Sequence, residues 1–132
     1  MSTQVSGGTA LDCFRRFADA INRHDMAALL AAMTPDHLFV DTLGNRVQGQ
    51  AIMAQGWQGY FAMCPDYWIR IDQAIAEGEV VLAAGTAGGT IDGTAWQTPA
   101  AWKAVVHGEC VAQWWVFADN KPVYDILAKR AR

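Results

Sequence analysis

The spacing of apolar residues changes at Tyr67 from a helical period to the alternation that is typical of strands. Four long runs with this period of two follow, over 67–76, 80–91, 94–106 and 110–117. Turn-forming residues separate them at 77–79, 92–93 and 107–109. Because short turns join antiparallel neighbours, we expect the second half of the chain to form an antiparallel sheet of long strands.

Helical spacing dominates the first half of the chain. The pattern predicts helices over 9–23, 26–33 and 49–63, a short strand over 38–41 and a turn at 45–46. Thr9 or Ser6 is placed to cap the first helix and Asp25 the second, which Pro35 stops because proline cannot continue the helical hydrogen bonding. After the sheet, Pro122 suits the first turn of a closing helix, with a last strand as the alternative.

Helices followed by antiparallel strands predict one α+β domain over 1–132, with a flexible start at 1–8. The sheet must curve around the helices to bury both apolar surfaces. Gly85, Gly88 and Gly89 interrupt one long strand, and glycines in strands mark bends or bulges. The expected architecture is a cone-shaped, strongly curved antiparallel sheet packed on three helices. The open end of such a cone is a usual place for a ligand.

Composition excludes several classes of partner. The net charge is −3 and no basic stripe is present, so we expect no nucleic-acid partner. No apolar run approaches the roughly 20 residues that cross a bilayer, and the polar start at 1–9 lacks the features of a signal peptide. We therefore expect no membrane partner and a cytoplasmic location.

Cysteine and histidine patterns give no sign of a metal or cofactor. Cys13, Cys64 and Cys110 are far apart and form no CxxC pair, so a disulfide framework or zinc site is not expected. No histidine or carboxylate cluster has the spacing of metal ligands. We predict neither a metal nor a cofactor.

Asp41 is the most informative single residue for function. It ends the predicted strand 38–41, just before a turn that contains Gly44. A carboxylate that hangs from a strand end into an apolar cavity is desolvated, which makes it a candidate base near neutral pH. The alternative is that Asp41 caps the turn through its side-chain oxygens.

Three segments carry a resemblance to a known family. They are FADAINRHDMAALL (17–30), TPDHLFVDTLG (34–44) and WWVFADN (114–120). The chain resembles the nuclear-transport-factor-2-like superfamily, and most closely its SnoaL-like and ketosteroid-isomerase-like branch. The resemblance implies a cystatin-like roll that hosts isomerases, cyclases, dehydratases, hydrolases and non-catalytic association modules.

In the isomerases of this superfamily, an Asp at a strand end is the base, and the resemblance assigns that position to Asp41. Their oxyanion hole uses a helical Tyr and a protonated Asp on a late strand. Those two positions are Phe17 and, by ungapped matching, Gln113 in this chain. The usual donor pair is therefore absent, and Tyr60 is a candidate replacement by helical spacing. The epoxide-hydrolase branch would instead require Asp41, Arg70 and either Asp119 or Asp125 to form a water-holding group.

Aromatic and polar residues supply candidate walls for a cavity. The candidate ligand-binding residues are Phe17, His37, Phe39, Trp57, Tyr60, Phe61, Trp102, Gln113 and Trp115, with Trp68 and Trp96 as further candidates. Core packing is the alternative for each aromatic residue. His37 shares a strand face with Asp41 and either shares a proton with it or lies near the surface.

Both faces of the last strand are apolar. Gln113, Trp115 and Phe117 share one face, and Trp114 and Val116 share the other. An uncovered face of this kind would be a large exposed apolar patch, so we predict a homodimer through the sheet. Our first functional hypothesis is a protein that binds an apolar ligand, cyclic or not, with proton transfer by Asp41. The second is a non-catalytic ligand-binding or self-associating module.

Overall fold

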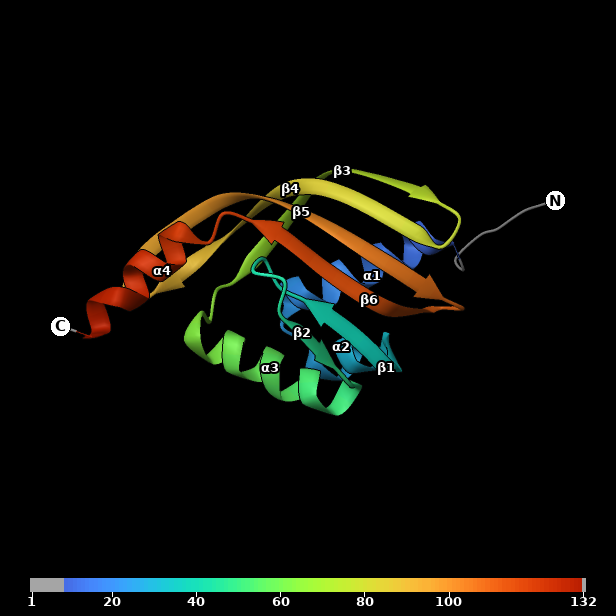
Figure 1. Cartoon of the computed structure of the whole chain (residues 1–132), viewed down its shortest axis with the longest axis horizontal. Coiled ribbons are helices and arrows are strands. Elements are labelled where there is room, and N and C mark those ends of the chain that lie inside the picture. Colours follow the sequence, from blue (N-terminus) through green and yellow to red (C-terminus); the bar gives the residue numbers. More distant parts are fainter. Residues whose placement is uncertain (1–8, 132) are drawn as a thin grey trace.

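A computed structural model describes residues 9–131 of the chain (Figure 1). The expectations for 1–8, including a cap at Ser6, lie outside the described residues. The elements are α1 (Ala10–Arg23), α2 (Met26–Ala31), β1 (Met33–Val40), β2 (Arg46–Gln48), α3 (Gln50–Met63), β3 (Trp68–Glu77), β4 (Val80–Ile91), β5 (Thr94–His107), β6 (Cys110–Ala118), α4 (Lys121–Ala128) and a 3₁₀ turn (Lys129–Ala131).

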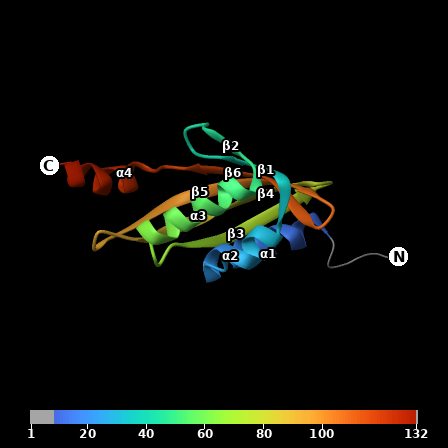
Figure 2. The ribbon, with the colours of Figure 1, turned by 90° about the horizontal axis from the view of Figure 1, so that it is seen from below.

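The described strands form one curved sheet in the order β2-β1-β6-β5-β4-β3. All neighbours are antiparallel except β1 and β6, which run parallel. Helices α1, α2 and α3 cover one face of the sheet, and α4 continues beyond the end of β6 (Figure 2). This arrangement confirms the predicted α+β fold with a strongly curved sheet.

Local signals in the sequence explain several of these elements. Thr9 caps α1 by accepting a hydrogen bond from the Asp12 N–H, and Asp25 caps α2. Pro122 lies in the first turn of α4, which confirms the closing helix rather than a last strand. Asp92 and Gly93 both have positive φ angles, as a two-residue hairpin turn between β4 and β5 requires.

The region between α2 and α3 differs from the expectation. Strand β1 begins at Met33 rather than at 38, and a short strand that was not expected, β2, begins at Arg46, the second residue of the expected turn. The pairing of β1 with β6 is irregular between Met33 and Leu38. Pro35 lies within this irregularity, where a missing N–H breaks no regular ladder. The local pattern could not reveal β2, because only its pairing with β1 makes it a strand.

The glycines of β4 allow close approach between strands. Strand β3 has a bulge between Ile71 and Gln73, directly opposite Gly85 of β4. A Cβ atom on Gly85 would lie 1.8 Å from the carbonyl oxygen of Arg70, so no side chain fits there. A Cβ atom on Gly89 would lie 2.3 Å from the Cys64 sulfur. These glycines let β3 bend and let the chain after α3 pack against the sheet.

The core under α1 contains three residues that we expected at a ligand site. Phe17 is fully buried, with its ring 4.5 Å from that of Trp114. His37 is also fully buried, stacks on Phe17 and donates from Nδ1 to the carbonyl oxygen of Val111 at 2.7 Å. Trp102 is only 2% exposed. His37 is therefore a core residue, neither near the surface nor paired with Asp41.

Candidate ligand-binding cavity

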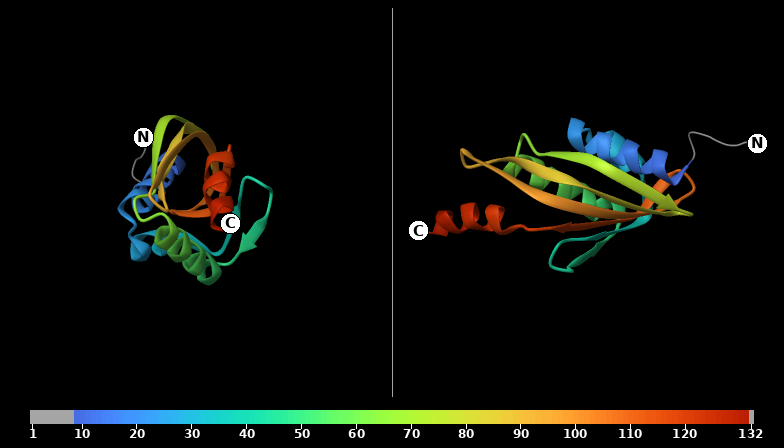
Figure 3. Two further views of the ribbon diagram at one scale, coloured as in Figure 1. Left: turned by 90° about the vertical axis from the view of Figure 1, so that its left-hand side faces the viewer. Right: turned by 90° about the horizontal axis from the view of Figure 1, so that it is seen from above.

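A cavity of about 630 Å³ lies between α3, α4 and the concave face of the sheet. The end view of Figure 3 shows α3 and α4 beside the curved strands. Six aromatic residues lie on its wall: Phe39, Trp57, Tyr60, Tyr67, Trp96 and Tyr124. Aliphatic residues and the two methionines of α3, Met53 and Met63, fill the spaces between them. The wall is therefore mostly apolar.

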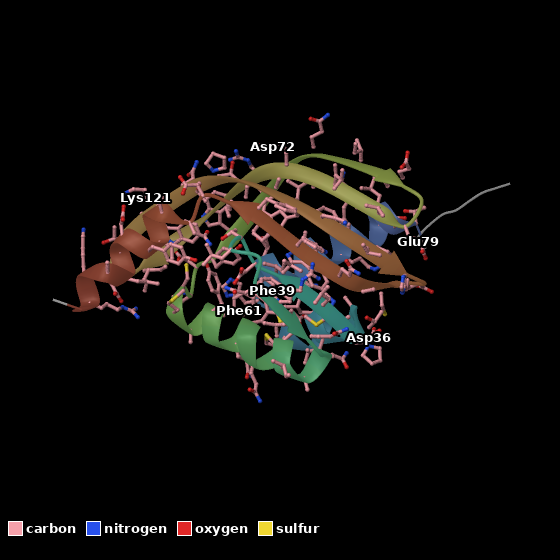
Figure 4. All side chains as sticks on the ribbon, viewed as in Figure 1. Asp36, Phe39, Phe61, Asp72, Glu79 and Lys121 are labelled. Atoms are coloured by element: carbon pink, nitrogen blue, oxygen red, sulfur yellow. The ribbon has the colours of Figure 1, made fainter. Side chains whose placement is uncertain are left out.

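Helix α3 supplies one side of the wall through residues at helical spacing. Met53, Trp57 and Tyr60 are separated by four and three positions, which places them along one face of the helix. Strand β1 contributes Phe39, whose ring meets Trp57 edge to face at 6.2 Å. Figure 4 shows Phe39 and Phe61 between the sheet and α3, whereas the labelled charged residues project outward.

Tyr67 joins the aromatic residues at the end of α3 to those of the sheet. Its ring lies 4.8 Å from Tyr60, 6.1 Å from Trp96 and 6.5 Å from Trp57. Burial raises the pKa of the Tyr60 hydroxyl and of the Tyr67 hydroxyl well above their ordinary value. Both phenols are therefore protonated throughout the physiological range.

Asp41 lies on the cavity wall and also caps its own turn. Its Oδ1 accepts hydrogen bonds from the N–H groups of Leu43 and Asn45, both at 2.9 Å. Its Oδ2 accepts from Nδ2 of Asn45 at 3.0 Å. Asp41 therefore caps the turn, as the alternative interpretation of the sequence predicted, and it also lies on the cavity wall. A carboxylate has roughly four acceptor positions, so about one remains for a ligand.

A second polar contact closes the same edge of the cavity. Nδ2 of Asn120 donates to the hydroxyl of Thr42 at 2.8 Å, which links the turn after β1 to the start of α4. Both residues lie on the wall. No Lys, Arg or His residue of the described chain lines the cavity, so Asp41 is its one charged group.

The structure divides the expected site residues into two groups. Asp41, Phe39, Trp57, Tyr60 and Trp96 line the cavity. Phe17, His37, Phe61, Trp68, Trp102, Gln113 and Trp115 do not. Tyr67 also lines the cavity, although it was not among the candidate site residues predicted from sequence.

A bulge explains why Gln113 and Trp115 lie away from the cavity. Val105 pairs with Gln113 but Val106 pairs with Val111, so Ala112 is an extra residue in β6. The alternation shifts by one position there, which turns Trp114 inward and Trp115 outward. Phe61 is displaced for another reason. It lies on the same side of α3 as Trp57, but its ring stacks on that of His24 at 4.0 Å, at the end of α1, rather than facing the cavity.

The group of residues expected for epoxide hydrolysis does not assemble. Arg70 pairs with Asp72 at 2.9 Å, and Asp125 pairs with Lys121 at 2.7 Å, in both cases among exposed side chains. Neither Arg70 nor Asp125 lies on the cavity wall, and Asp119 is also absent from it. Asp41 therefore has no arginine partner among residues 9–131.

The convex face of the sheet carries exposed apolar side chains. Ile75 is 62% exposed, Leu82 49% and Phe117 51%. The Trp115 ring lies between two cations, 5.0 Å from the Arg46 guanidinium carbon and 4.9 Å from Nζ of Lys103. Leu82 pairs with Lys103, which pairs with Trp115, so these residues form one row across the face.

The described residues contain neither a metal-binding cluster nor a membrane-spanning helix. Within 9–131, no group of three or more His, Cys, Asp or Glu side chains is arranged to hold a metal ion. None of the helices in the same range is long and apolar enough to cross a membrane.

Solved structures share this fold at low sequence identity. A protein described as a SnoaL-like polyketide cyclase from Shewanella putrefaciens CN-32 is 17% identical, with a TM-score of 0.78 over 91% of this chain and 86% of that one. A protein with a ketosteroid isomerase-like fold from Catenulispora acidiphila DSM 44928, in complex with trimethylamine, is 22% identical, with a TM-score of 0.74 over 80% of this chain and 84% of that one. An LEH-like epoxide hydrolase from M. tuberculosis is 20% identical, with a TM-score of 0.77 over 90% of this chain and 86% of that one.

No curated protein matches the chain. The model of the SnoaL-like domain family matches residues 14–124, which includes every helix and strand that lines the cavity except the end of α4. The curved sheet and the structural neighbours agree with that match and confirm the resemblance predicted from sequence. The chain therefore belongs to the SnoaL-like domain family, within the nuclear-transport-factor-2-like superfamily.

Proposed function

We propose that this protein binds a mostly apolar, ring-containing small molecule in the cavity between α3, α4 and the sheet. The observation that carries the proposal is the cavity itself, about 630 Å³ with six aromatic residues on its wall. Small-molecule sites are typically apolar clefts of roughly 300–1,000 Å³ with a few polar groups that orient the ligand. Asp41, Thr42 and Asn120 supply such polar groups at one edge.

Helix α3 offers a matched pair of variants to test this proposal. Gly56 lies on the cavity wall, whereas Gly59, one turn later, has open space around it and does not line the cavity. Leucine at either position should stabilise the helix by up to about 1 kcal/mol, since glycine is a poor helix former. Only Gly56→Leu places a side chain into the cavity.

Trp57 and Trp96 on the wall make intrinsic fluorescence a direct reporter of binding. We expect bicyclic ring compounds to change this fluorescence with saturation in the wild type and in Gly59→Leu. Binding should be weakened at least about tenfold in Gly56→Leu, because a leucine side chain occupies the space of several ligand atoms. Equal affinities in the two variants, or no binding to the wild type, would refute the proposal.

A second candidate function is proton transfer by Asp41. The position of Asp41 on the cavity wall favours this function. The carboxylate would remove a proton from a carbon next to a ligand carbonyl and return it, as an isomerase, cyclase or dehydratase requires. The measurement is hydrogen–deuterium exchange of the carbon-bound protons of α-tetralone in D₂O, followed by NMR. Exchange that the wild type accelerates and Asp41→Asn does not would support the role. If the ketone binds but its exchange is not accelerated, the proton-transfer role is refuted and only the binding function stands.

We also propose that a second copy of the chain covers the convex face. Exposed apolar side chains at Ile75, Leu82 and Phe117 support this proposal, since monomers rarely expose such patches. Leu82→Arg should shift a dimer to monomer in sedimentation experiments. Leu43→Arg is the control, because Leu43 is 68% exposed but lies in the turn after β1. A wild-type monomer at high concentration would end this proposal.

A further inference from the structure

The polar edge of the cavity, formed by Asp41, Thr42 and Asn120, offers hydrogen-bond acceptors. Oδ2 of Asp41 accepts one hydrogen bond, from Nδ2 of Asn45, and a carboxylate oxygen can accept a second. Nδ2 of Asn120 donates to Thr42, and Oδ1 of the same amide has no hydrogen-bond partner within residues 9–131. A ligand group that docks at the polar edge is therefore best served by donating hydrogen bonds.

The negative charge at the polar edge has no counter-ion on the cavity wall. The three hydrogen bonds that Asp41 accepts come from uncharged N–H groups of Leu43 and Asn45, which do not neutralise the carboxylate. No Lys, Arg or His residue within 9–131 lines the cavity. An apolar ligand that fills the cavity displaces water from the open side of the carboxylate, and a charge left unpaired against apolar surface is costly. A ligand that carries a positive charge at this position removes that cost.

Aromatic side chains come from the two elements that adjoin the polar edge, β1 and α4. Phe39 precedes Asp41 by two residues, so both side chains point to the same side of the chain, and both line the cavity. Tyr124 lies one turn after Asn120, to whose carbonyl oxygen its N–H donates at 3.0 Å, and it lines the cavity as well. The faces of aromatic rings carry partial negative charge and attract cations, ammonium groups in particular. The polar edge thus combines a carboxylate with nearby aromatic rings.

We propose that the polar edge binds a protonated amine, so that the cavity selects apolar ring compounds that carry an ammonium group. The ammonium N–H groups donate to Oδ2 of Asp41 and Oδ1 of Asn120, and the ring system fills the aromatic part of the cavity. The inference rests on the proposed binding function and specifies the chemistry of its ligand. It gives Asp41 a binding role in place of proton transfer, because a carboxylate paired with a cation is a poor base.

Matched probes separate this inference from the binding proposal. The compounds 2-aminotetralin, 2-methyltetralin and tetralin-2-carboxylate share one ring skeleton, and at pH 7 their substituents are positive, uncharged and negative. We expect the amine to bind about threefold to tenfold more tightly than 2-methyltetralin, as hydrogen bonds to a charged group allow after the loss of hydration. The carboxylate should bind more weakly than either.

The fluorescence of Trp57 and Trp96 reports the binding of all three probes. If 2-methyltetralin binds as tightly as the amine, or if the carboxylate binds more tightly than the amine, the ammonium site is refuted and the proposed function stands. If none of the three probes binds, the proposed function is refuted together with the inference.

Asparagine variants test whether Asp41 itself recognises the amine. Asp41→Asn removes the charge but keeps an oxygen that can accept from the N–H groups of Leu43 and Asn45. Asp125→Asn is the control, because it removes the same charge from a side chain that pairs with Lys121 and does not line the cavity. The preference for the amine over 2-methyltetralin should disappear in Asp41→Asn and persist in Asp125→Asn. An equal loss in both variants would show a general effect of net charge and would contradict the assignment.

Ionic strength gives a readout that requires no variant and that a purely structural role of Asp41 would not change. Raising the salt concentration from about 0.05 M to about 0.5 M screens the attraction between an ammonium group and a partly exposed carboxylate. The preference of the wild type for the amine over 2-methyltetralin should therefore shrink severalfold. A preference that does not depend on salt would overturn the proposal.

Discussion

His37 should make the stability of this protein fall steeply in mildly acidic solution. Its ring is fully buried, and burial lowers its pKa from the ordinary value of 6.5 despite the opposing hydrogen bond to Val111 and the nearby Asp36. Below pH 6.5 the unfolded chain therefore binds a proton that the folded protein does not. The free energy of unfolding then falls as the pH falls, with a slope of up to about 1.4 kcal/mol per pH unit. Between about pH 7.5 and pH 5.5 the loss is therefore at most about 1.4 kcal/mol.

His37→Asn is the variant that isolates this effect. The asparagine amide can take the place of Nδ1 and donate to the carbonyl oxygen of Val111, yet it does not titrate. The smaller side chain leaves a void that costs about 1–3 kcal/mol at every pH. We expect urea unfolding to show a pH-independent loss in the variant and the pH-dependent loss only in the wild type. His24 and His107 are present in both proteins, so their contributions cancel. Identical pH profiles would refute the reasoning.

Three further variants test the fold. Gly85→Ala should destabilise the protein by about 3 kcal/mol in urea unfolding, because its Cβ would collide with a backbone carbonyl rather than with a movable side chain. Asp66 accepts two hydrogen bonds from Thr90, and these bonds lower the pKa of its carboxyl group. The ionised carboxylate therefore stabilises the fold at pH values above its ordinary pKa, and this stabilisation is lost as the pH falls through the lowered pKa. In Asp66→Asn, the free energy of unfolding should depend less on pH in acidic solution. Asn120→Ala removes the bond to Thr42 and should cost about 1 kcal/mol and speed amide exchange in α4.

Part of the candidate site could be predicted from residues near one another in the sequence. The helical spacing of Trp57 and Tyr60 places both on one face of α3, and both line the cavity. Asp41 was identified from its position at a strand end, where it both caps the turn and lines the cavity. Tyr67 could not be assigned in the same way, since its neighbours Tyr60, Trp57 and Trp96 come from two other elements.

The sequence by itself determined the elements whose signals are local. Caps at Thr9 and Asp25, the period of two from Tyr67 onward and the turn at 92–93 specify helices and hairpins through contacts between near neighbours. The chain could also be recognised as an α+β roll, because helices that precede long antiparallel strands have few ways to bury their apolar faces.

Only the tertiary structure decided which side of each strand faces inward. Alternation sorts the side chains of β6 into two sets, but the extra residue Ala112 exchanges the sets and so turns Trp114 rather than Trp115 toward the core. The parallel pairing of β1 with β6 and the burial of His37 arise in the same way, from contacts between residues more than 70 positions apart. Such contacts are fixed by the packing of the whole chain, which no local window of residues contains.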